Sequence, residues 1–228
     1  LEYIVLTPHF NGYKADNNPN LQANAIVSRE VADEGMVLLK NNGVLPLGGK
    51  TKKPTRVSLY GTGSYNFLSG GVGSGCVHTP YIIDLVQGLK NVGIETTSDL
   101  TEIYKKYIDY AKLKFEADRS GFRWFEAPLM GDQKMPEIDI THELLKKQLK
   151  QSDMAIITIS RQAGEGIDRK IDGEFNLTPQ EMKMIQDVST AYHGENKPVI
   201  VVINSGSVIE TTSWSAYPDA ILLAWQPG

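Results

Sequence analysis

A carboxylate on a glycine-flanked loop is the residue of this chain best suited to chemistry. Glu165 has a glycine on each side and follows the apolar run 155–160. That run is short, continuous and rich in β-branched residues, which is typical of a strand buried on both faces. A carboxylate just beyond the carboxyl end of such a strand lies where open α/β sheets bind ligands, and the glycines leave room for a substrate. Glu165 is therefore the first candidate for a residue that carries out chemistry, with a solvated loop glutamate as the alternative.

Other charged residues follow Glu165 closely. Asp172 and Glu174 are rival carboxylates, but neither has flanking glycines. Asp168 and Arg169 are adjacent and opposite in charge, which predicts a structural ion pair that shapes the loop.

A glycine-rich stretch follows another predicted strand and is the second candidate for ligand binding. Residues 61–64 (GTGS) continue to 69–75 (SGGVGSG). Glycine-rich turns between a strand and a helix can bind phosphates, but Asn66 replaces the third glycine of the dinucleotide-binding pattern. We therefore expect a backbone-lined wall of a polar cleft in which Ser74 offers its hydroxyl to a ligand. A turn serine that bonds its own backbone is the alternative.

Metal and nucleophilic-serine chemistry are not indicated. No His, Cys, Asp or Glu residues have the spacing of a metal site, and His78 and His142 are expected to be ordinary polar residues. Ser205 lacks the Gly-x-Ser-x-Gly pattern of a hydrolase nucleophile.

Alternating helices and strands are predicted to position these loops. The predicted helices span 22–40, 81–92, 101–118, 142–151 and a segment opening at Thr178. The predicted strands span 56–61, 94–97, 155–160, 197–204 and 220–225. The helix at Thr178 has a capping box, because Pro179 suits the first helical position and Glu181 lies three residues after the threonine. This order predicts an α/β sandwich, that is, a mostly parallel sheet sandwiched between helices.

The composition is ordinary for a globular chain and gives no reason to expect binding to nucleic acid or a membrane span. Its 228 residues are 41% hydrophobic and 22% charged, with a net charge of -4. Nucleic-acid-binding domains are typically basic, and no apolar stretch approaches the roughly 18 residues of a membrane span. Cys76 is the single cysteine, so no disulfide can form within the chain and the redox compartment is left open.

Several stretches, in order along the chain, resemble the second domain of family 3 glycoside hydrolases. Residues 27–47, which contain SREVADEGMVLLKN, resemble the start of that domain, and 70–75 followed by Pro80-Tyr81 resemble its glycine-rich loop. Ser160-Arg161 with 164–166 and Asp168-Arg169 resemble its catalytic loop. VINSG at 202–206, Trp214, and Ala224-Trp225 with Pro227-Gly228 match its later strands.

The resemblance implies a function in which two domains each supply one catalytic carboxylate. In the β-glucosidases of this family, a (β/α)8 barrel comes first and supplies the nucleophilic aspartate, while the α/β sandwich supplies the acid/base. Glu165 would then be the acid/base and Ser74 a residue that contacts the cleaved glucose. The resemblance implies a β-glucoside or oligosaccharide substrate, the barrel of the same protein as partner, and no metal or organic cofactor. Because the nucleophile is not in this chain, we expect the chain alone to be inactive.

The same resemblance sets the expected domain limits. Residues 1–21 would be the tail of the barrel and a linker, and residues 22–228 the sandwich. We expect the sandwich to be truncated before its final elements, because no covering helix follows the buried strand 220–225. Two alternatives stay open, namely a β-xylosidase or other exo-β-glycosidase of the same family, and a non-catalytic ligand-binding or interaction domain.

Overall fold

The computed structural model describes residues 2–12, 14, 18–48, 53–71, 79–119, 135–162 and 168–227. The chain divides into two units, Leu1–Glu34 and Gly35–Gly228. Glu165, Ser74, His78 and Cys76 lie outside the described residues.

The described residues of the first unit form helices joined by turns and irregular segments. It contains α1 (Glu2–Val5) and nearly all of α2 (Leu21–Gly35). Asn20 caps α2, because its Oδ1 accepts a hydrogen bond from the amide of Ala23 at 3.0 Å. None of the helices in the described ranges is long and apolar enough to cross a lipid bilayer.

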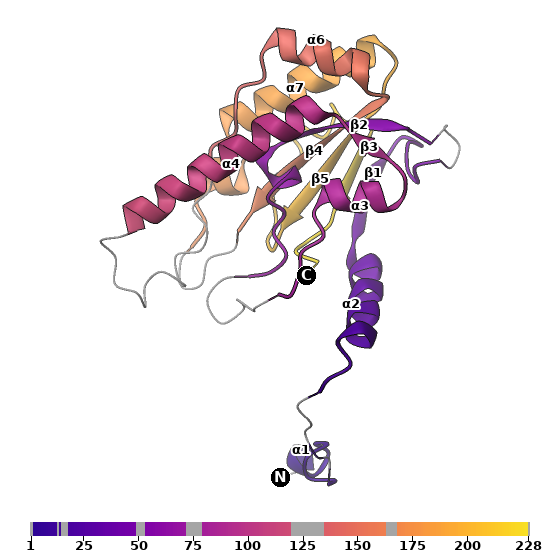
Figure 1. Ribbon diagram of the computed structural model, residues 1–228, viewed down its shortest axis with the longest axis vertical. Coiled ribbons are helices and arrows are strands. Elements are labelled where there is room, and N and C mark those ends of the chain that lie inside the picture. Colours follow the sequence, from indigo (N-terminus) through magenta and orange to yellow (C-terminus); the bar gives the residue numbers. More distant parts are fainter. Residues whose placement is uncertain are drawn as a thin grey trace. The chain divides into compact units, whose positions relative to one another are not determined.

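The second unit is built on a six-stranded sheet in the order β1-β6-β5-β4-β2-β3 (Figure 1). The strands are β1 (Val37–Asn41), β2 (Arg56–Tyr60), β3 (Glu95–Thr96), β4 (Met154–Arg161), β5 (Val199–Ser205) and β6 (Ala220–Leu223). All neighbouring pairs are parallel except β1 and β6, which run antiparallel. The prediction of a mostly parallel sheet is thus confirmed, with one antiparallel edge strand added.

The prediction that the first helix extends to Lys40 is wrong, because its last residues form strand β1. The helix α2 ends at Gly35, and residues 37–41 pair with β6 instead. The Lys40 ammonium donates hydrogen bonds to the carbonyl oxygens of Ser215 and Pro218, each at 2.7 Å. These partners are far away in the sequence, so tertiary contacts override the helical pattern of a short apolar run.

Helices cover the sheet as the alternating order requires. They are α3 (Leu85–Asn91), α4 (Ser98–Arg119), α6 (His142–Gln151) and α7 (Pro179–Gly194). The helices α4, α6 and α7 gather on one face of the sheet (Figure 1). The helix α3 connects β2 to the edge strand β3, and α4 connects β3 back to β4 on the other side of β2. The two connections run in opposite directions along the sheet. Right-handed crossovers therefore put α3 and α4 on opposite faces. This arrangement confirms the predicted α/β sandwich.

The predicted element limits hold best where a cap or a long apolar run marks them. The helix predicted over 142–151 matches α6. The helix predicted to open at Thr178 is α7, and both hydrogen bonds of its capping box are present. In contrast, α3 begins at Leu85 rather than Tyr81 because the Asp84 side chain caps the helix by accepting from the amide of Gln87 at 2.8 Å.

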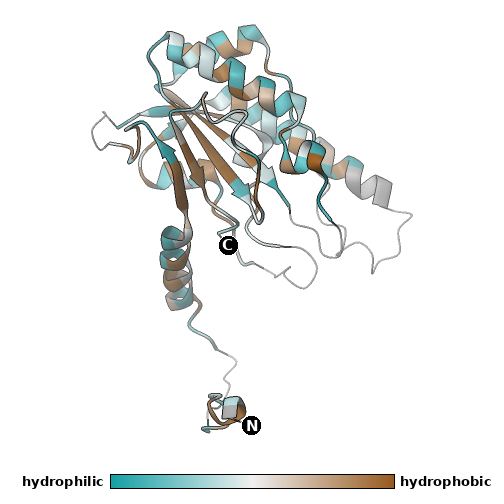
Figure 2. Cartoon of the chain, turned by 180° about the vertical axis from the view of Figure 1, so that it is seen from behind, coloured by the Kyte–Doolittle hydropathy of each residue, from teal (hydrophilic) through white to brown (hydrophobic). Residues whose placement is uncertain are grey.

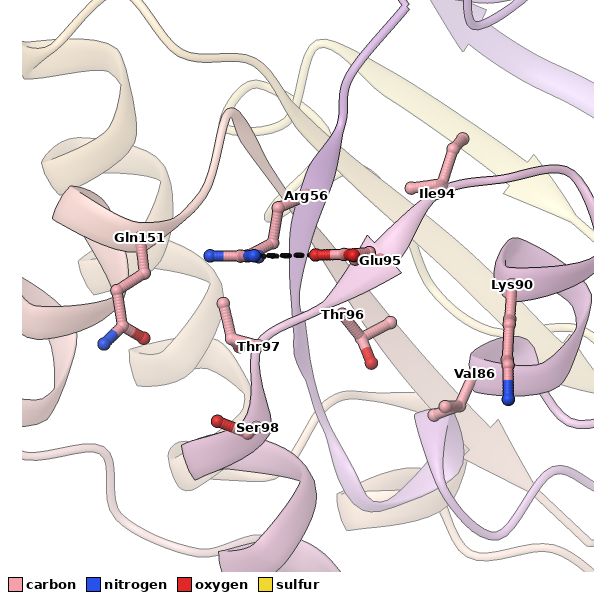
Figure 3. A pocket seen from close by; sticks show the side chains of 9 residues that line it. All are labelled: Arg56, Val86, Lys90, Ile94, Glu95, Thr96, Thr97, Ser98 and Gln151. Atoms are coloured by element: carbon pink, nitrogen blue, oxygen red, sulfur yellow. Dashed lines mark hydrogen bonds and ion pairs between the residues drawn. The ribbon is translucent and has the colours of Figure 1, made fainter.

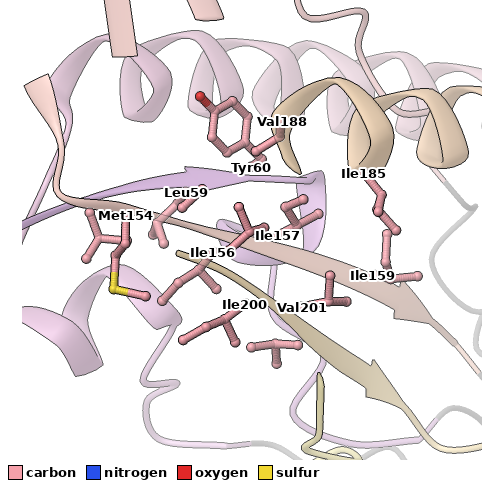
Figure 4. Close-up of a cluster of buried hydrophobic side chains, with 14 of the residues drawn as sticks. Leu59, Tyr60, Met154, Ile156, Ile157, Ile159, Ile185, Val188, Ile200 and Val201 are labelled. Atoms are coloured by element: carbon pink, nitrogen blue, oxygen red, sulfur yellow. The ribbon is translucent and has the colours of Figure 1, made fainter. Parts of the chain in front are cut away.

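The core lies between the central strands and the helices above them. All seven residues of β5 are buried, and so are all residues of β4 except Ser160. The central strands are accordingly apolar along most of their length (Figure 2). Ile185 and Val188 of α7 are fully buried against this surface, as Figure 4 shows. Burial on both faces explains why these strands read as continuous apolar runs.

A sharp turn leaves the end of β2 and lies directly on β4. Gly61 follows β2 with a φ angle of 89°, and the 3-10 turn η1 (Thr62–Ser64) comes next. A Cβ atom on Gly61 would lie 2.3 Å from the carbonyl oxygen of Thr158. The contact is with main chain, so a side chain cannot simply rotate away.

Replacing Gly61 by alanine is therefore expected to destabilise the fold. A positive φ and a main-chain clash together should cost about 2 to 4 kcal/mol, measurable as a lower midpoint of urea unfolding. Gly194→Ala is the control, because a Cβ there meets no atom within 4 Å. It should leave stability equal or raise it by about 0.4 to 1 kcal/mol. Equal midpoints for the two variants would contradict the expected clash.

Candidate active site

Polar residues collect where the parallel strands end, at the carboxyl edge of the sheet. Thr62 follows β2, Gln162 follows β4, and Asn204 lies near the end of β5. Ligands of open α/β sheets bind at this edge. The five residues 163–167, which include Glu165, continue from the end of β4 in the sequence.

Asn204 holds three segments together at this edge. Its side chain is fully buried and hydrogen-bonds both main-chain groups of Leu68, accepting from the amide at 2.7 Å and donating to the carbonyl at 2.9 Å. The same side chain donates to the carbonyl of Trp225 at 2.7 Å and accepts from the Ser160 hydroxyl at 3.2 Å. Asn204 thus fixes the chain after β6 and the start of the glycine-rich stretch against β4 and β5.

Gln162 makes a second connection between the two stretches that carry the predicted site residues. Its Nε2 donates to the carbonyl of Gly70 at 3.2 Å. Gln162 immediately precedes the segment of Glu165, and Gly70 shortly precedes that of Ser74. The described flanks of both predicted site residues are therefore in direct contact.

Arg161, the last residue of β4, is anchored by a buried ion pair. Its guanidinium donates to the two carboxylate oxygens of Glu181 at 2.6 and 2.7 Å. The side chains of Arg161 and Glu181 are only 3% and 7% exposed. The same carboxylate completes the cap of α7 by accepting from the amide of Thr178 at 2.8 Å. One buried carboxylate thus joins the end of β4 to the start of α7.

Arg169 shapes the chain after Glu165, although not through the predicted ion pair with Asp168. Its guanidinium donates to the main-chain carbonyls of Val208 and Glu174, each at 2.5 Å. Asp168 is exposed to solvent. Burial, together with the nearby positive charge of Arg161, lowers the pKa of Arg169.

The two rival carboxylates differ in their surroundings. Asp172 is exposed. The carboxylate of Glu174 accepts a hydrogen bond from the amide of Lys170 at 2.6 Å, which closes the turn η3 (Ile171–Phe175). Glu174 therefore has a structural contact.

Glu137 is a buried carboxylate at the carboxyl edge that the sequence did not point to. It accepts from the amide of Thr62 at 2.9 Å, from the hydroxyl of Tyr104 at 3.0 Å and from the amide of Ile138 at 3.0 Å. Burial raises its pKa, and the charge of Glu181 adds to the effect, while these hydrogen bonds oppose it. The amide of Thr62, which a phosphate-binding loop would offer to its ligand, is thus occupied by a carboxylate.

A surface pocket of ≈ 490 Å³ lies at the other end of β2 (Figure 3). It is lined by Arg56, Val86, Lys90, Ile94, Glu95, Thr96, Thr97, Ser98 and Gln151. Arg56, the first residue of β2, forms an ion pair with Glu95 at 2.6 Å across this pocket. The pocket is formed by the start of β2, by β3 and by residues of α3, α4 and α6. The anchored residues of the carboxyl edge lie at the opposite ends of β2, β4 and β5.

The described ranges contain no group of three or more His, Cys, Asp or Glu residues that could hold a metal ion. His142 begins α6 and is exposed. The Ser205 hydroxyl donates to the carbonyl of Ser207 at 2.7 Å, within its own turn.

The sequence analysis did not identify three residues whose hydrogen bonds hold segments together at the carboxyl edge of the sheet, namely Asn204, Gln162 and Glu137. A polar residue at or just after the end of a buried strand is the signal that could have found Asn204 and Gln162. Glu137 follows a stretch without periodicity, so no local pattern marks it.

Comparison with known proteins agrees with this architecture. Residues 36–228 match the family model described as "Glycosyl hydrolase family 3 C-terminal domain". Beta-glucosidase A of Butyrivibrio fibrisolvens is 37% identical, over 89% of this chain and 25% of that protein. A beta-glucosidase of Ruminococcus albus is 29% identical, over 87% of this chain and 20% of that protein.

A solved structure shares both the fold and part of the sequence. Beta-glucosidase 3B from Thermotoga neapolitana, in complex with alpha-D-glucose, superposes with a TM-score of 0.83 at 36% identity. The match covers 99% of this chain and 30% of that protein. The chain thus spans about a quarter of the length of the relatives it matches. It belongs to glycosyl hydrolase family 3, as a C-terminal domain of that family.

Proposed function

We propose that this chain is the acid/base-bearing domain of a retaining β-glucosidase. The observation that carries the proposal is the anchoring of the described residues on either side of 163–167 at the carboxyl edge of a family 3 sheet. Arg161 binds the Glu181 carboxylate there, and Arg169 binds the carbonyl of Glu174. Relatives at 36 and 37% identity bear the name beta-glucosidase, which supports terminal β-linked glucose as the group removed.

In this proposal Glu165 acts twice. As a general acid it protonates the glycosidic oxygen while a carboxylate attacks the anomeric carbon, which releases the leaving group and forms a glucosyl-enzyme. As a general base it then takes a proton from water, which attacks the same carbon and releases glucose. Ser74 contacts the sugar hydroxyls of the cleaved glucose. The two carboxyl groups of retaining enzymes stand about 5 to 5.5 Å apart.

The attacking carboxylate is proposed to lie on a (β/α)8 barrel domain of the same protein, outside these 228 residues. The relatives are about three to five times as long as their matched portion, which leaves room for such a domain. Residues 1–21 are proposed to be the tail of the barrel and a linker. The division after Glu34 and the family match from residue 36 support a separate sandwich domain.

An activity assay on two proteins tests the proposal. The 228-residue chain alone should not hydrolyse an aryl β-glucoside, because it lacks the attacking carboxylate. The protein encoded by the longer reading frame, expressed in full, should hydrolyse it and release glucose with retained β configuration. An aryl β-xyloside assayed beside it decides the sugar preference. Robust turnover by the 228-residue chain would contradict the two-domain assignment.

A further inference from the structure

Two arginines that flank the segment of Glu165 donate hydrogen bonds to a single acceptor. Arg161 Nε donates to the main-chain carbonyl oxygen of Glu174 at 3.1 Å. Arg169 Nη2 donates to the same oxygen at 2.5 Å. Residues 162–168 lie between these two arginines in the sequence, so one oxygen receives hydrogen bonds from the residues on both sides of this segment.

The shared acceptor is itself held in place. The turn that contains it is closed by the amide of Asn176, which donates to the carbonyl of Ile171 at 2.8 Å. The amide of Glu210 donates to the carbonyl of Phe175 at 2.9 Å. The turn 171–175 is therefore joined to the chain that follows β5.

Arg169 connects this turn to a second carbonyl. While one nitrogen of its guanidinium binds Glu174, the other donates to the carbonyl of Val208 at 2.5 Å. A guanidinium is planar and presents its donors in a fixed fork, whereas the lysine ammonium is a single point charge on a flexible stem. Arginine is thus the residue suited to bridging the two carbonyls.

We propose that Arg161 and Arg169 are positioning residues for Glu165, because they hold the chain on both sides of its segment at the carbonyl of Glu174. This inference rests on the proposed function, because it needs Glu165 to be the acid/base. A proton donor must lie within hydrogen-bond reach of the leaving oxygen, and a displacement of about 1 Å can cost on the order of 100-fold in rate.

Arg169→Lys tests the inference, because it keeps the positive charge and loses the fork. The longer protein is assayed on two aryl β-glucosides, one with a good leaving group and one with a poor leaving group. Only the poor leaving group needs full protonation, so kcat/KM for that substrate should fall about tenfold or more. For the good leaving group, kcat/KM should change less than about threefold. The ratio between the substrates is measured on one sample and does not depend on the fraction of folded enzyme.

Arg56→Lys is the matched control. Arg56 pairs with Glu95 at the start of β2, and this variant should leave the ratio between substrates unchanged. An equal loss on both substrates in Arg169→Lys, or no loss, would overturn the inference.

The proposed function and the inference fail in different ways. If the wild-type longer protein does not hydrolyse aryl β-glucosides, or if Glu165→Ala shows no dependence on the leaving group, the proposed function is wrong. If Glu165→Ala shows that dependence and Arg169→Lys behaves like Arg56→Lys, only the positioning role is wrong.

Discussion

Glu165→Ala in the longer protein should slow hydrolysis of a β-glucoside with a poor leaving group by about 10²- to 10⁴-fold, the usual contribution of general acid-base catalysis. The leaving oxygen then departs without a proton donor. For a substrate with a good leaving group, the glucosyl-enzyme should still form, because departure needs little help. It should then accumulate, because no base activates the water that must attack it.

Azide should restore turnover of Glu165→Ala on the good-leaving-group substrate. Azide is a small anion that attacks the anomeric carbon without losing a proton, so it does not need the missing base. The product should be β-glucosyl azide, detectable by mass spectrometry and NMR. Rescue with this stereochemistry would locate the acid/base at Glu165 and the attacking group elsewhere.

Asp172→Ala provides the comparison for this experiment. Asp172 is a nearby carboxylate that is exposed to solvent, so its loss should leave kcat/KM within about twofold of wild type and give no azide product. If azide rescued Asp172→Ala and not Glu165→Ala, the acid/base would be Asp172 and our assignment of Glu165 would be wrong. Absence of rescue in both variants would argue against any acid/base in this part of the chain.

The sequence predicted most of the sheet because its central strands are buried on both faces. The run 155–160 is apolar or β-branched at every position except Ser160, and the structure buries all of it except Ser160 within β4. Thr178 was equally readable, because all partners of a capping box lie within three residues. Elements whose signal lies within a few neighbouring residues, such as a buried strand or a capping box, could thus be predicted from the sequence.

The edge strand β1 and the long-range contacts that hold the candidate site could not be predicted from local sequence patterns. The segment 37–41 becomes a strand because β6 offers it a free edge, and Lys40 binds carbonyls of residues more than 170 positions away. Gly35, at the end of α2, was the local signal that the helix could stop there.

The ion pair of Arg161 shows the same limit at the site. The capping role of Glu181 is local and was predicted, whereas its pairing with Arg161 depends on how α7 packs on β4. The pairing of Asp168 with Arg169, predicted from adjacency, gave way to main-chain carbonyls brought close by folding. Glycine and glutamate spacing thus located the candidate loop, while its anchors required the structure.

The buried pair between Arg161 and Glu181 leads to the largest stability effect we expect. Glu181→Gln keeps the shape of the side chain but removes the negative charge that faces a guanidinium only 3% exposed. Removing one partner of a buried ion pair costs about 3 to 5 kcal/mol, because the remaining charge is left in a poorly solvated place. The free energy of unfolding, measured in urea, should fall by that amount.

Thr178→Ala separates the ion pair from the helix cap. The Thr178 hydroxyl accepts from the amide of Glu181 at 3.2 Å, so this variant removes that cap hydrogen bond and leaves Arg161 paired. Loss of a capping threonine typically costs about 1 kcal/mol. Glu181→Gln should cost clearly more than Thr178→Ala, because only Glu181→Gln leaves Arg161 without its carboxylate. If the two variants lose the same stability, the buried charge pair does not hold the end of β4 to α7, and Arg161 must be fixed by its carbonyl contacts alone.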